Sequence, residues 1–256
     1  MIDIHSHILP GIDDGANDSG ESLRLARKAC ELGLEGIIAT PHYRNDQPAP
    51  EKVESRLNDL KKLLVEENLD LKLMPGEEVT ICHNLAKKVK NDQVLGLNNS
   101  RYILIEFPFN RIPRFSEDVF YDLKIMGYYP ILAHPARYNF VNKDIGSFYE
   151  MVVETGIYAQ LDAACLTGKF GSKIKKTAIQ LVENDLVHFL ASDSHSSVSL
   201  LDSYVEALDI LDNFPGNKKE RYLENARQVV DDKEITAPEP KRPKKGMFGK
   251  IKSIFR

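Results

Sequence analysis

The chain begins MIDIHSHILPGIDDGA (residues 1–16), and this stretch governs the interpretation of the rest of the sequence. A short apolar run ends in His5 and His7, which are separated by one residue. On an extended strand, residues i and i+2 point to the same side, so both imidazoles face one way. Asp13 and Asp14 follow closely. The spacing suits a cation held by imidazole and carboxylate, provided that distant parts of the chain supply more ligands.

The bulk composition is that of a soluble globular protein, with 42% hydrophobic and 28% charged residues. The 256 residues suffice for one large domain and match the length of an α/β barrel. Three widely spaced cysteines indicate free thiols in a reducing cytoplasm. The net charge is −4, yet residues 241–256 contain seven basic residues and no acidic ones. The remaining acidic body is a poor nucleic-acid binder.

Short β-rich runs alternate with amphipathic helical patterns up to about residue 230. Strands are predicted at Ile2–His5, Gly36–Thr40, Leu71–Met74, Tyr102–Phe107, Tyr129–His134, Tyr158–Leu161 and Val187–Ala191. Several are continuous apolar runs, as expected of parallel strands covered on both faces. Successive βα units favour a barrel over residues 1–230, with an open doubly wound sheet as the alternative. Residues 231–256 are predicted to form a disordered tail.

Most of the histidines and several carboxylates come just after the predicted strands. In a βα barrel, the carboxyl ends of the strands meet at one edge, which carries the active site. The residues at this edge are His5, His7, His42, Glu77 or Glu78, Glu106, His134, Asp193 and His195. Imidazole and carboxylate suit zinc, iron or manganese, and the set is large enough for two or three neighbouring sites. His83 and His188 fall outside this edge and are predicted to be structural.

Clustered divalent cations have a clear chemical use. They lower the pKa of water and hold the oxygens of a phosphoryl group. Arg137, three residues after His134, adds a planar donor suited to phosphate. Other hydrolytic machinery is missing from the sequence: no cysteine is followed at the required spacing by arginine, and neither a nucleophile elbow nor a phosphate-binding P-loop is present.

Six motifs now resemble one known family, the polymerase-and-histidinol-phosphatase (PHP) superfamily. They are MIDIHSHILPGIDDGA (1–16), IIATPHY (37–43), MPGEEV (74–79), YILIEFPF (102–109), ILAHPAR (131–137) and HFLASDSH (188–195). The nearest resemblance is to the bacterial manganese-dependent protein-tyrosine phosphatases of capsule and exopolysaccharide synthesis. It extends from Met1 to about residue 230. It implies a distorted (β/α)7 barrel and a three-metal cluster of Mn2+, with Fe, Zn or Mg as other options.

The resemblance also implies roles for particular residues. The metal ligands carried over by motif are His5, His7, Asp14, His42, Glu78, Glu106, His134, Asp193 and His195. Arg137, His42 and Asp14 are implied as catalytic residues, and Asp3 as a residue that orients a ligand histidine. The implied substrate is phosphotyrosine on the C-terminal tail of a bacterial tyrosine autokinase.

One departure from the family pattern concerns phosphate binding. Relatives carry an arginine several residues after the Ser-Asp-x-His motif, whereas SSVSLLDSY (196–204) contains none. Arg137 would then hold the phosphate alone or with Arg44, and Ala136 stands where a glutamate is common. Two alternatives therefore remain open: a hydrolase of small phosphomonoesters such as histidinol phosphate, and a weakly active regulator that binds phosphotyrosine.

The C-terminal segment KRPKKGMFGKIKSIFR (241–256) combines basic residues with apolar residues at helical spacing. A basic amphipathic helix of this kind can lie on an anionic membrane. The predicted location is cytoplasmic, with the tail as a means of attachment to the inner face of the cell membrane. A disordered solubilising tail is the alternative.

Overall fold

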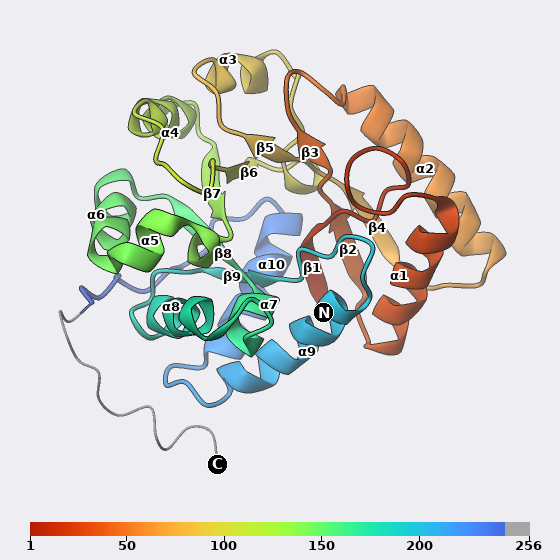
Figure 1. The fold of residues 1–256 in the computed structure, drawn as a ribbon. Coiled ribbons are helices and arrows are strands. Elements are labelled where there is room, and N and C mark those ends of the chain that lie inside the picture. The colour runs from red at the N-terminus through yellow and green to blue at the C-terminus, as the bar shows by residue number, and fades with distance from the viewer. Residues whose placement is uncertain (244–256) are drawn as a thin grey trace.

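Parallel strands form the inner wall of the protein in the computed structural model, which describes residues 1–243 (Figure 1). The strands are β1 (Ile2–Ser6), β2 (Gly36–Ala39), β3 (His42–Tyr43), β4 (Lys72–Pro75), β5 (Glu78–Thr80), β6 (Tyr102–Glu106), β7 (Tyr129–Ala133), β8 (Tyr158–Asp162) and β9 (Phe189–Ala191). The predicted strands are all present with small shifts at their ends. The sequence did not predict the short strands β3 and β5, which resume β2 and β4 after a break.

The strands close into a distorted barrel. One sheet has the order β1-β2-β4 and the other the order β3-β5-β6-β7-β8-β9. The interrupted strands β2/β3 and β4/β5 therefore each contribute one half to either sheet. The first and last strands then meet: Asp193 N donates to His5 O at 3.0 Å, and His7 N donates to Ser194 O at 2.7 Å. This closure confirms the predicted (β/α)7 barrel and rules out the open sheet.

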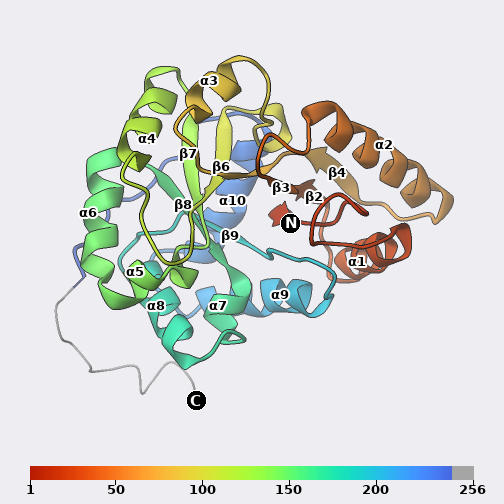
Figure 2. The same ribbon diagram turned by 45° about the horizontal axis from the view of Figure 1, so that its top comes forward.

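The helices form the outer layer (Figure 2). They are α1 (Ser19–Glu31), α2 (Pro50–Glu66), α3 (Leu85–Lys90), α4 (Ser116–Ile125), α5 (Asn139–Lys143), α6 (Ile145–Thr155), α7 (Ala163–Thr167), α8 (Ser172–Glu183), α9 (Ser199–Leu211) and α10 (Lys218–Val230). The largest part of the core lies between these helices and the strands. A second cluster fills the barrel interior, where Ala226 and Val229 of α10 pack against Ile4 and Leu104. Helix α10 therefore covers the end opposite to the predicted site.

Residues 231–243 pack against the barrel, contrary to the prediction of disorder from residue 231. Ile235 is buried, and Tyr102 Oη donates to Lys233 O at 2.8 Å while accepting from Ile235 N at 3.2 Å. Further along, Lys241 N donates to Asn184 O at 2.8 Å. The polar, proline-containing composition excludes a regular helix or strand, but it does not prevent an irregular segment from packing. The remainder of the predicted membrane-binding segment lies outside the described residues.

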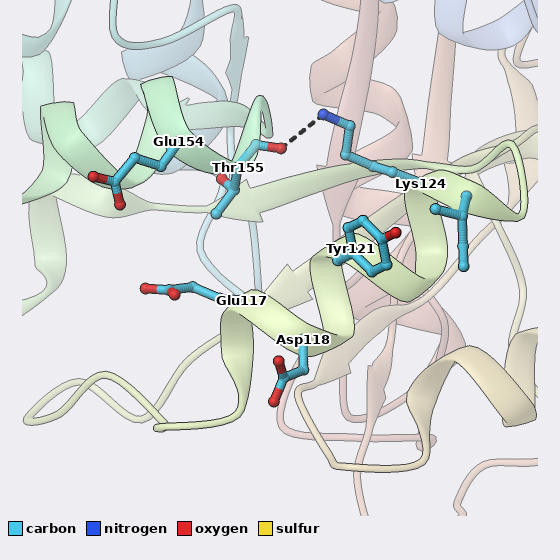
Figure 3. A pocket seen from close by; sticks show the side chains of 7 residues that line it. Glu117, Asp118, Tyr121, Lys124, Glu154 and Thr155 are labelled. Carbon is cyan, nitrogen blue, oxygen red and sulfur yellow. Dashed lines mark hydrogen bonds between the residues drawn. The ribbon is translucent and has the colours of Figure 1, made fainter.

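A groove of about 510 Å³ runs between α4 and α6 on the outer layer (Figure 3). Lys124 Nζ crosses it and donates to Thr155 O at 2.7 Å. Its lining includes the exposed side chain of Tyr121 but none of the predicted site residues. In residues 1–243, no helix is both long and apolar enough to span a bilayer.

His188 is buried just before β9, in keeping with the structural role predicted for it. Its Nδ1 accepts a hydrogen bond from Ala159 N at 3.1 Å. Burial lowers the pKa of His188 to about 4, and the positive charge of Arg221 acts in the same direction. The folded state therefore favours the neutral imidazole.

This histidine predicts a loss of stability in acid. An unfolded histidine titrates near pH 6.5, so the unfolded chain gains a proton as the pH falls below that value while folded His188 stays neutral until about pH 4. Between pH 7 and 5 we expect His188 to remove about 2 kcal/mol from the free energy of unfolding. Urea denaturation of wild type and His188→Gln at both pH values measures the effect. Equal losses in the two proteins would contradict it.

Candidate metal centre

A β-bulge in β1 turns His5 and His7 toward the barrel interior. Asp3 pairs with Ile37 and Ser6 pairs with Ala39, so β1 has one more residue than β2 in this interval. An extra residue shifts the alternation of side chains and places the residues after it on the opposite face. The two histidines thereby share the interior with the ends of the other strands.

Asp3 stays on the other face, and it contacts the ligand histidine His5 through the backbone and not through the imidazole. Its carboxylate accepts hydrogen bonds from Ser192 N at 2.9 Å and Ser192 Oγ at 2.5 Å, and from the backbone N–H of His5 at 3.4 Å. Asp3 thus ties β1 to the strand end beyond β9.

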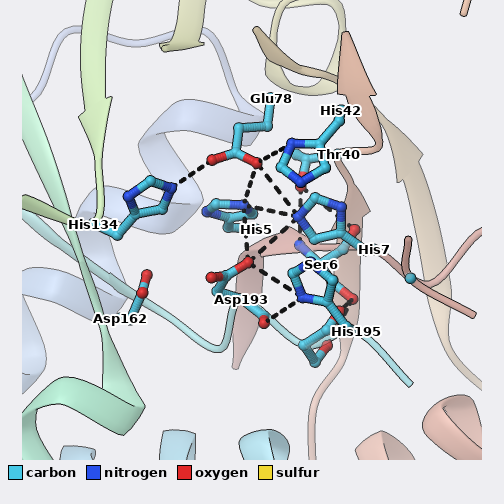
Figure 4. Close-up of polar contacts among 12 residues, drawn as sticks. His5, Ser6, His7, Thr40, His42, Glu78, His134, Asp162, Asp193 and His195 are labelled. Carbon is cyan, nitrogen blue, oxygen red and sulfur yellow. Dashed lines mark hydrogen bonds and ion pairs between the residues drawn. The ribbon is translucent and has the colours of Figure 1, made fainter. Parts of the chain in front are cut away.

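Two other residues orient the histidines by contacting Nδ1, the ring nitrogen that points away from the cluster. His5 Nδ1 lies 2.9 Å from Gln160 Oε1, and His7 Nδ1 lies 2.7 Å from Asp13 Oδ2. Because both partners are acceptors, Nδ1 donates in each ring, and Nε2 is the nitrogen left to take a proton or a cation. The two Nε2 atoms face each other at 3.2 Å (Figure 4).

Two carboxylates face the same pair of nitrogens. Glu78 Oε2 lies 3.5 Å from Nε2 of both His5 and His7, and Asp193 Oδ1 lies 3.3 Å from both. Glu78 Oε2 is buried and makes no hydrogen bond. Burial alone would lower the pKa of His5, but Asp193 and Glu78 outweigh it and raise that pKa to about 9. The four acceptor atoms together attract positive charge.

These distances fit a divalent cation. Nitrogen and oxygen ligands about 2.1 Å from one ion stand roughly 3 to 3.5 Å from each other. Three overlapping sets of ligand atoms lie within 4.8 Å of one another. The sets are His5, His7 and Asp193; His7, Asp14, His42 and His195; and His42, Glu78 and Glu106. The barrel thus brings eight of the predicted ligands into three adjoining sets.

His134, the remaining predicted ligand, lies beside these sets. Its Nε2 is 2.7 Å from Glu78 Oε1, and its Nδ1 is buried without a hydrogen-bond partner. His134 and Asp193 both have a left-handed backbone, with φ of 37° and 49°. Histidine and aspartate adopt this conformation more readily than most residues other than glycine. Here they occur just beyond β7 and β9, where they direct the two side chains into the cluster.

Two arginines flank the cluster. Arg137 Nη1 lies 2.5 Å from Asp193 Oδ2 and 3.2 Å from Asp162 Oδ2. Arg44 Nε lies 2.9 Å from Glu106 Oε1, and its side chain is half exposed. The predicted arginine pair is therefore divided between the Asp193 side and the Glu106 side of the cluster.

Three residues that the sequence motifs did not indicate also contribute to this site. Asp162 ends β8 and contacts Arg137, so the rule that selected Glu106 would also have found it. Gln160 lies two residues earlier, on the same face of the strand, and donates to Asp162 Oδ1 at 3.1 Å. Asp13 was passed over in favour of Asp14, although it holds His7 and also accepts from the backbone N–H of His42 at 2.9 Å.

A family model described as "Capsular polysaccharide synthesis, CpsB/CapC" matches residues 1–231. The chain belongs to the CpsB/CapC family. Its relatives include "Tyrosine-protein phosphatase YwqE" of Bacillus subtilis, which is 39% identical over 97% of this chain and 99% of its own length. "Putative tyrosine-protein phosphatase CapC" of Staphylococcus aureus is 35% identical over 94% of this chain and 95% of its own length.

Solved structures agree with this CpsB/CapC membership. A structure described as one of "YwqE from Bacillus subtilis and CpsB from Streptococcus pneumoniae, unique metal-dependent tyrosine phosphatases" superposes with a TM-score of 0.89 and 37% identity. It covers 95% of this chain and 100% of its own. A β-aspartyl dipeptidase from Fervidobacterium islandicum, at 13% identity and a TM-score of 0.53, shares only the fold, over 94% of this chain and 76% of its own.

Adjacent glutamates provide a matched test of the metal centre. Glu78 lies in the cluster, whereas Glu77 is buried elsewhere and accepts from Leu95 N at 2.9 Å. Burial raises the pKa of Glu77 to about 8. We expect Glu78→Gln to lose at least one bound metal ion per chain because it removes a negative charge from the centre. Elemental analysis with circular dichroism measures metal content and folding.

Glu77→Gln is the control, since it keeps an acceptor for Leu95 N and leaves the cluster untouched. Its metal content should match that of wild type. A full complement of metal in Glu78→Gln would contradict the assignment of Glu78.

Proposed function

We propose that this protein is a metal-dependent protein-tyrosine phosphatase whose substrate is the phosphotyrosine tail of a bacterial tyrosine kinase in capsule or exopolysaccharide synthesis. The observation that carries the proposal is the trio of adjoining imidazole and carboxylate sets inside the barrel. The names of the CpsB/CapC relatives support the choice of phosphotyrosine. The capsular description of the family supports the pathway.

We further propose a three-metal cluster of Mn2+. Mixed imidazole and carboxylate donors suit manganese, iron and zinc, and the carboxylates would also accept magnesium. The cluster residues would hold these ions, with Glu78 placed between sets and His134 beside it. When bound, such ions lower the pKa of water and hold the oxygens of a phosphoryl group.

The side chains around the cluster orient the ligand histidines and bind the phosphate group. Gln160 and Asp13 keep the proton on Nδ1 of His5 and His7, so that the Nε2 lone pairs stay directed into the cluster. Arg137 would hold a phosphate oxygen, because Asp193 and Asp162 engage only its Nη1. A phenolate leaving group has a pKa near ~10 and needs little help from a general acid.

His42 and Asp14 mark the open side of the cluster. His42 Nδ1 lies 2.7 Å from the buried Glu78 Oε2, while His42 Nε2 lies 3.3 Å from Asp14 Oδ1. The Asp14 side chain is 65% exposed. A phosphate group and a water molecule would therefore enter past Asp14, which suits the catalytic role proposed for this pair.

Phosphate release tests the assignment. In the presence of manganese, we expect wild type to release phosphate from a phosphotyrosine peptide and His42→Ala to lose about 100-fold or more in rate. His83→Ala is the matched control, because the His83 ring contacts that of Phe115, with 3.6 Å between the ring centroids, outside the cluster. Its activity should equal that of wild type.

The same assay separates the alternatives. Turnover of histidinol phosphate without turnover of the peptide would replace the proposal with a small-molecule phosphatase. Peptide that is bound but never hydrolysed would replace it with a phosphotyrosine-binding regulator.

We also propose a cytoplasmic location with attachment of residues 241–256 to an anionic membrane. Support comes from the basic and apolar composition of this segment. Lys241 Nζ pairs with Asp185 Oδ2 at 2.7 Å and Arg242 pairs with Glu150, so these two cations hold the segment on the barrel. The sequence from residue 244 onward supplies five further cations for attraction to an anionic membrane.

Vesicle sedimentation tests this attachment. Full-length protein should pellet with vesicles containing anionic lipid and remain in solution with neutral vesicles. A 1–243 truncation keeps Lys241 and Arg242 on the barrel and should remain in solution with both. Equal pelleting of the two proteins with anionic vesicles would discard the idea.

A further inference from the structure

Two exposed phenylalanines flank Arg137. The Arg137 Cζ atom lies 4.9 Å from the ring centroid of Phe109 and 5.5 Å from that of Phe170. Phe109 follows β6, and Phe170 lies between α7 and α8, so the two rings reach this arginine from separate loops. They are 42% and 41% exposed. Two aromatic rings from separate loops that leave part of their surface open to water beside one cation offer a face for a ligand.

The rings stand next to the metal centre. The Phe109 ring centroid lies 5.5 Å from that of His134, whose Nε2 contacts Glu78. Phe170 is connected to the centre through Arg137, which pairs with Asp193. Each ring is therefore one side chain removed from the cluster of imidazoles and carboxylates.

Phe109 is held in place even though its ring is exposed. Its carbonyl accepts a hydrogen bond from Asn139 N at 2.9 Å, and its ring lies 5.9 Å from the ring of buried Tyr138. A rigid aromatic face offers binding area at little entropic cost. The positive charge of Arg137 beside both rings fixes them further through cation–π attraction.

We propose that Phe109 and Phe170 form a subsite for the aryl ring of the substrate. The inference rests on the proposed phosphatase function and adds the basis of its selectivity. With the phosphate at the metal centre and Arg137, an aryl ring joined to that phosphate through the ester oxygen contacts the two rings. An alkyl phosphate of equal charge gains the phosphate contacts but leaves the rings in water. The subsite thus favours aryl over alkyl phosphates through aromatic and apolar contact.

Competitive inhibition of the manganese-loaded enzyme tests the subsite with two stable probes, phenylphosphonate and methylphosphonate. Wild type should bind phenylphosphonate more tightly. Phe109→Ala and Phe170→Ala should each weaken phenylphosphonate by about tenfold and leave methylphosphonate unchanged. Phe109→Tyr and Phe170→Tyr keep an aromatic face and should restore the preference. Tyr121→Ala removes a more exposed aromatic side chain from the distant groove between α4 and α6, and it should change neither inhibition constant.

The outcomes distinguish the subsite from other roles. If an alanine variant weakens both phosphonates equally, the rings only position Arg137 and the subsite is overturned. If neither phosphonate changes, the rings have no part in binding and the inference fails. The proposed function fails separately, when wild type releases no phosphate from phosphotyrosine peptide.

Discussion

Four acceptor atoms face one another inside a closed barrel, and this electrostatic conflict organises the molecule. The Nε2 atoms of His5 and His7 lie 3.2 Å from each other and 3.3 to 3.5 Å from the carboxylates of Glu78 and Asp193. Buried acceptors without donors are costly, and buried like charges repel each other strongly. Bound divalent cations would turn the same arrangement from a destabilising feature into a strong binding site.

The barrel maintains this arrangement because its apolar core and its candidate metal centre lie at opposite ends. Apolar side chains inside the barrel, helix α10 and Ile235 fill the end that lies away from the metal centre. At the carboxyl edge, His134 and Asp193 have left-handed backbone angles, and β1 contains a bulge. The well-packed end can bear these local costs, which is why a site built from many distant segments is held in one geometry.

The surroundings of the metal centre also indicate what kind of phosphate ester fits. Positive charges lie on two sides of the cluster: Arg137 pairs with Asp193, and Arg44 pairs with Glu106. Exposed aromatic rings lie beside Arg137, namely those of Phe109 and Phe170. A phosphate bound at the cluster therefore has an aromatic neighbourhood on one side, which agrees with the tyrosine phosphatase activity named for the CpsB/CapC relatives.

The sequence by itself determined the positions of seven strands, the barrel class and the convergence of the predicted ligands at one edge. Hydrophobic runs report local burial, and the carboxyl ends of parallel strands share an edge whatever the details of the loops. Only the tertiary structure decided that Asp3 faces away from the imidazoles, that Gln160 and Asp13 orient them, and that residues 231–243 pack on the barrel. These features depend on a bulge in strand register and on contacts between segments far apart in the chain, and neither leaves a periodic signal in the sequence.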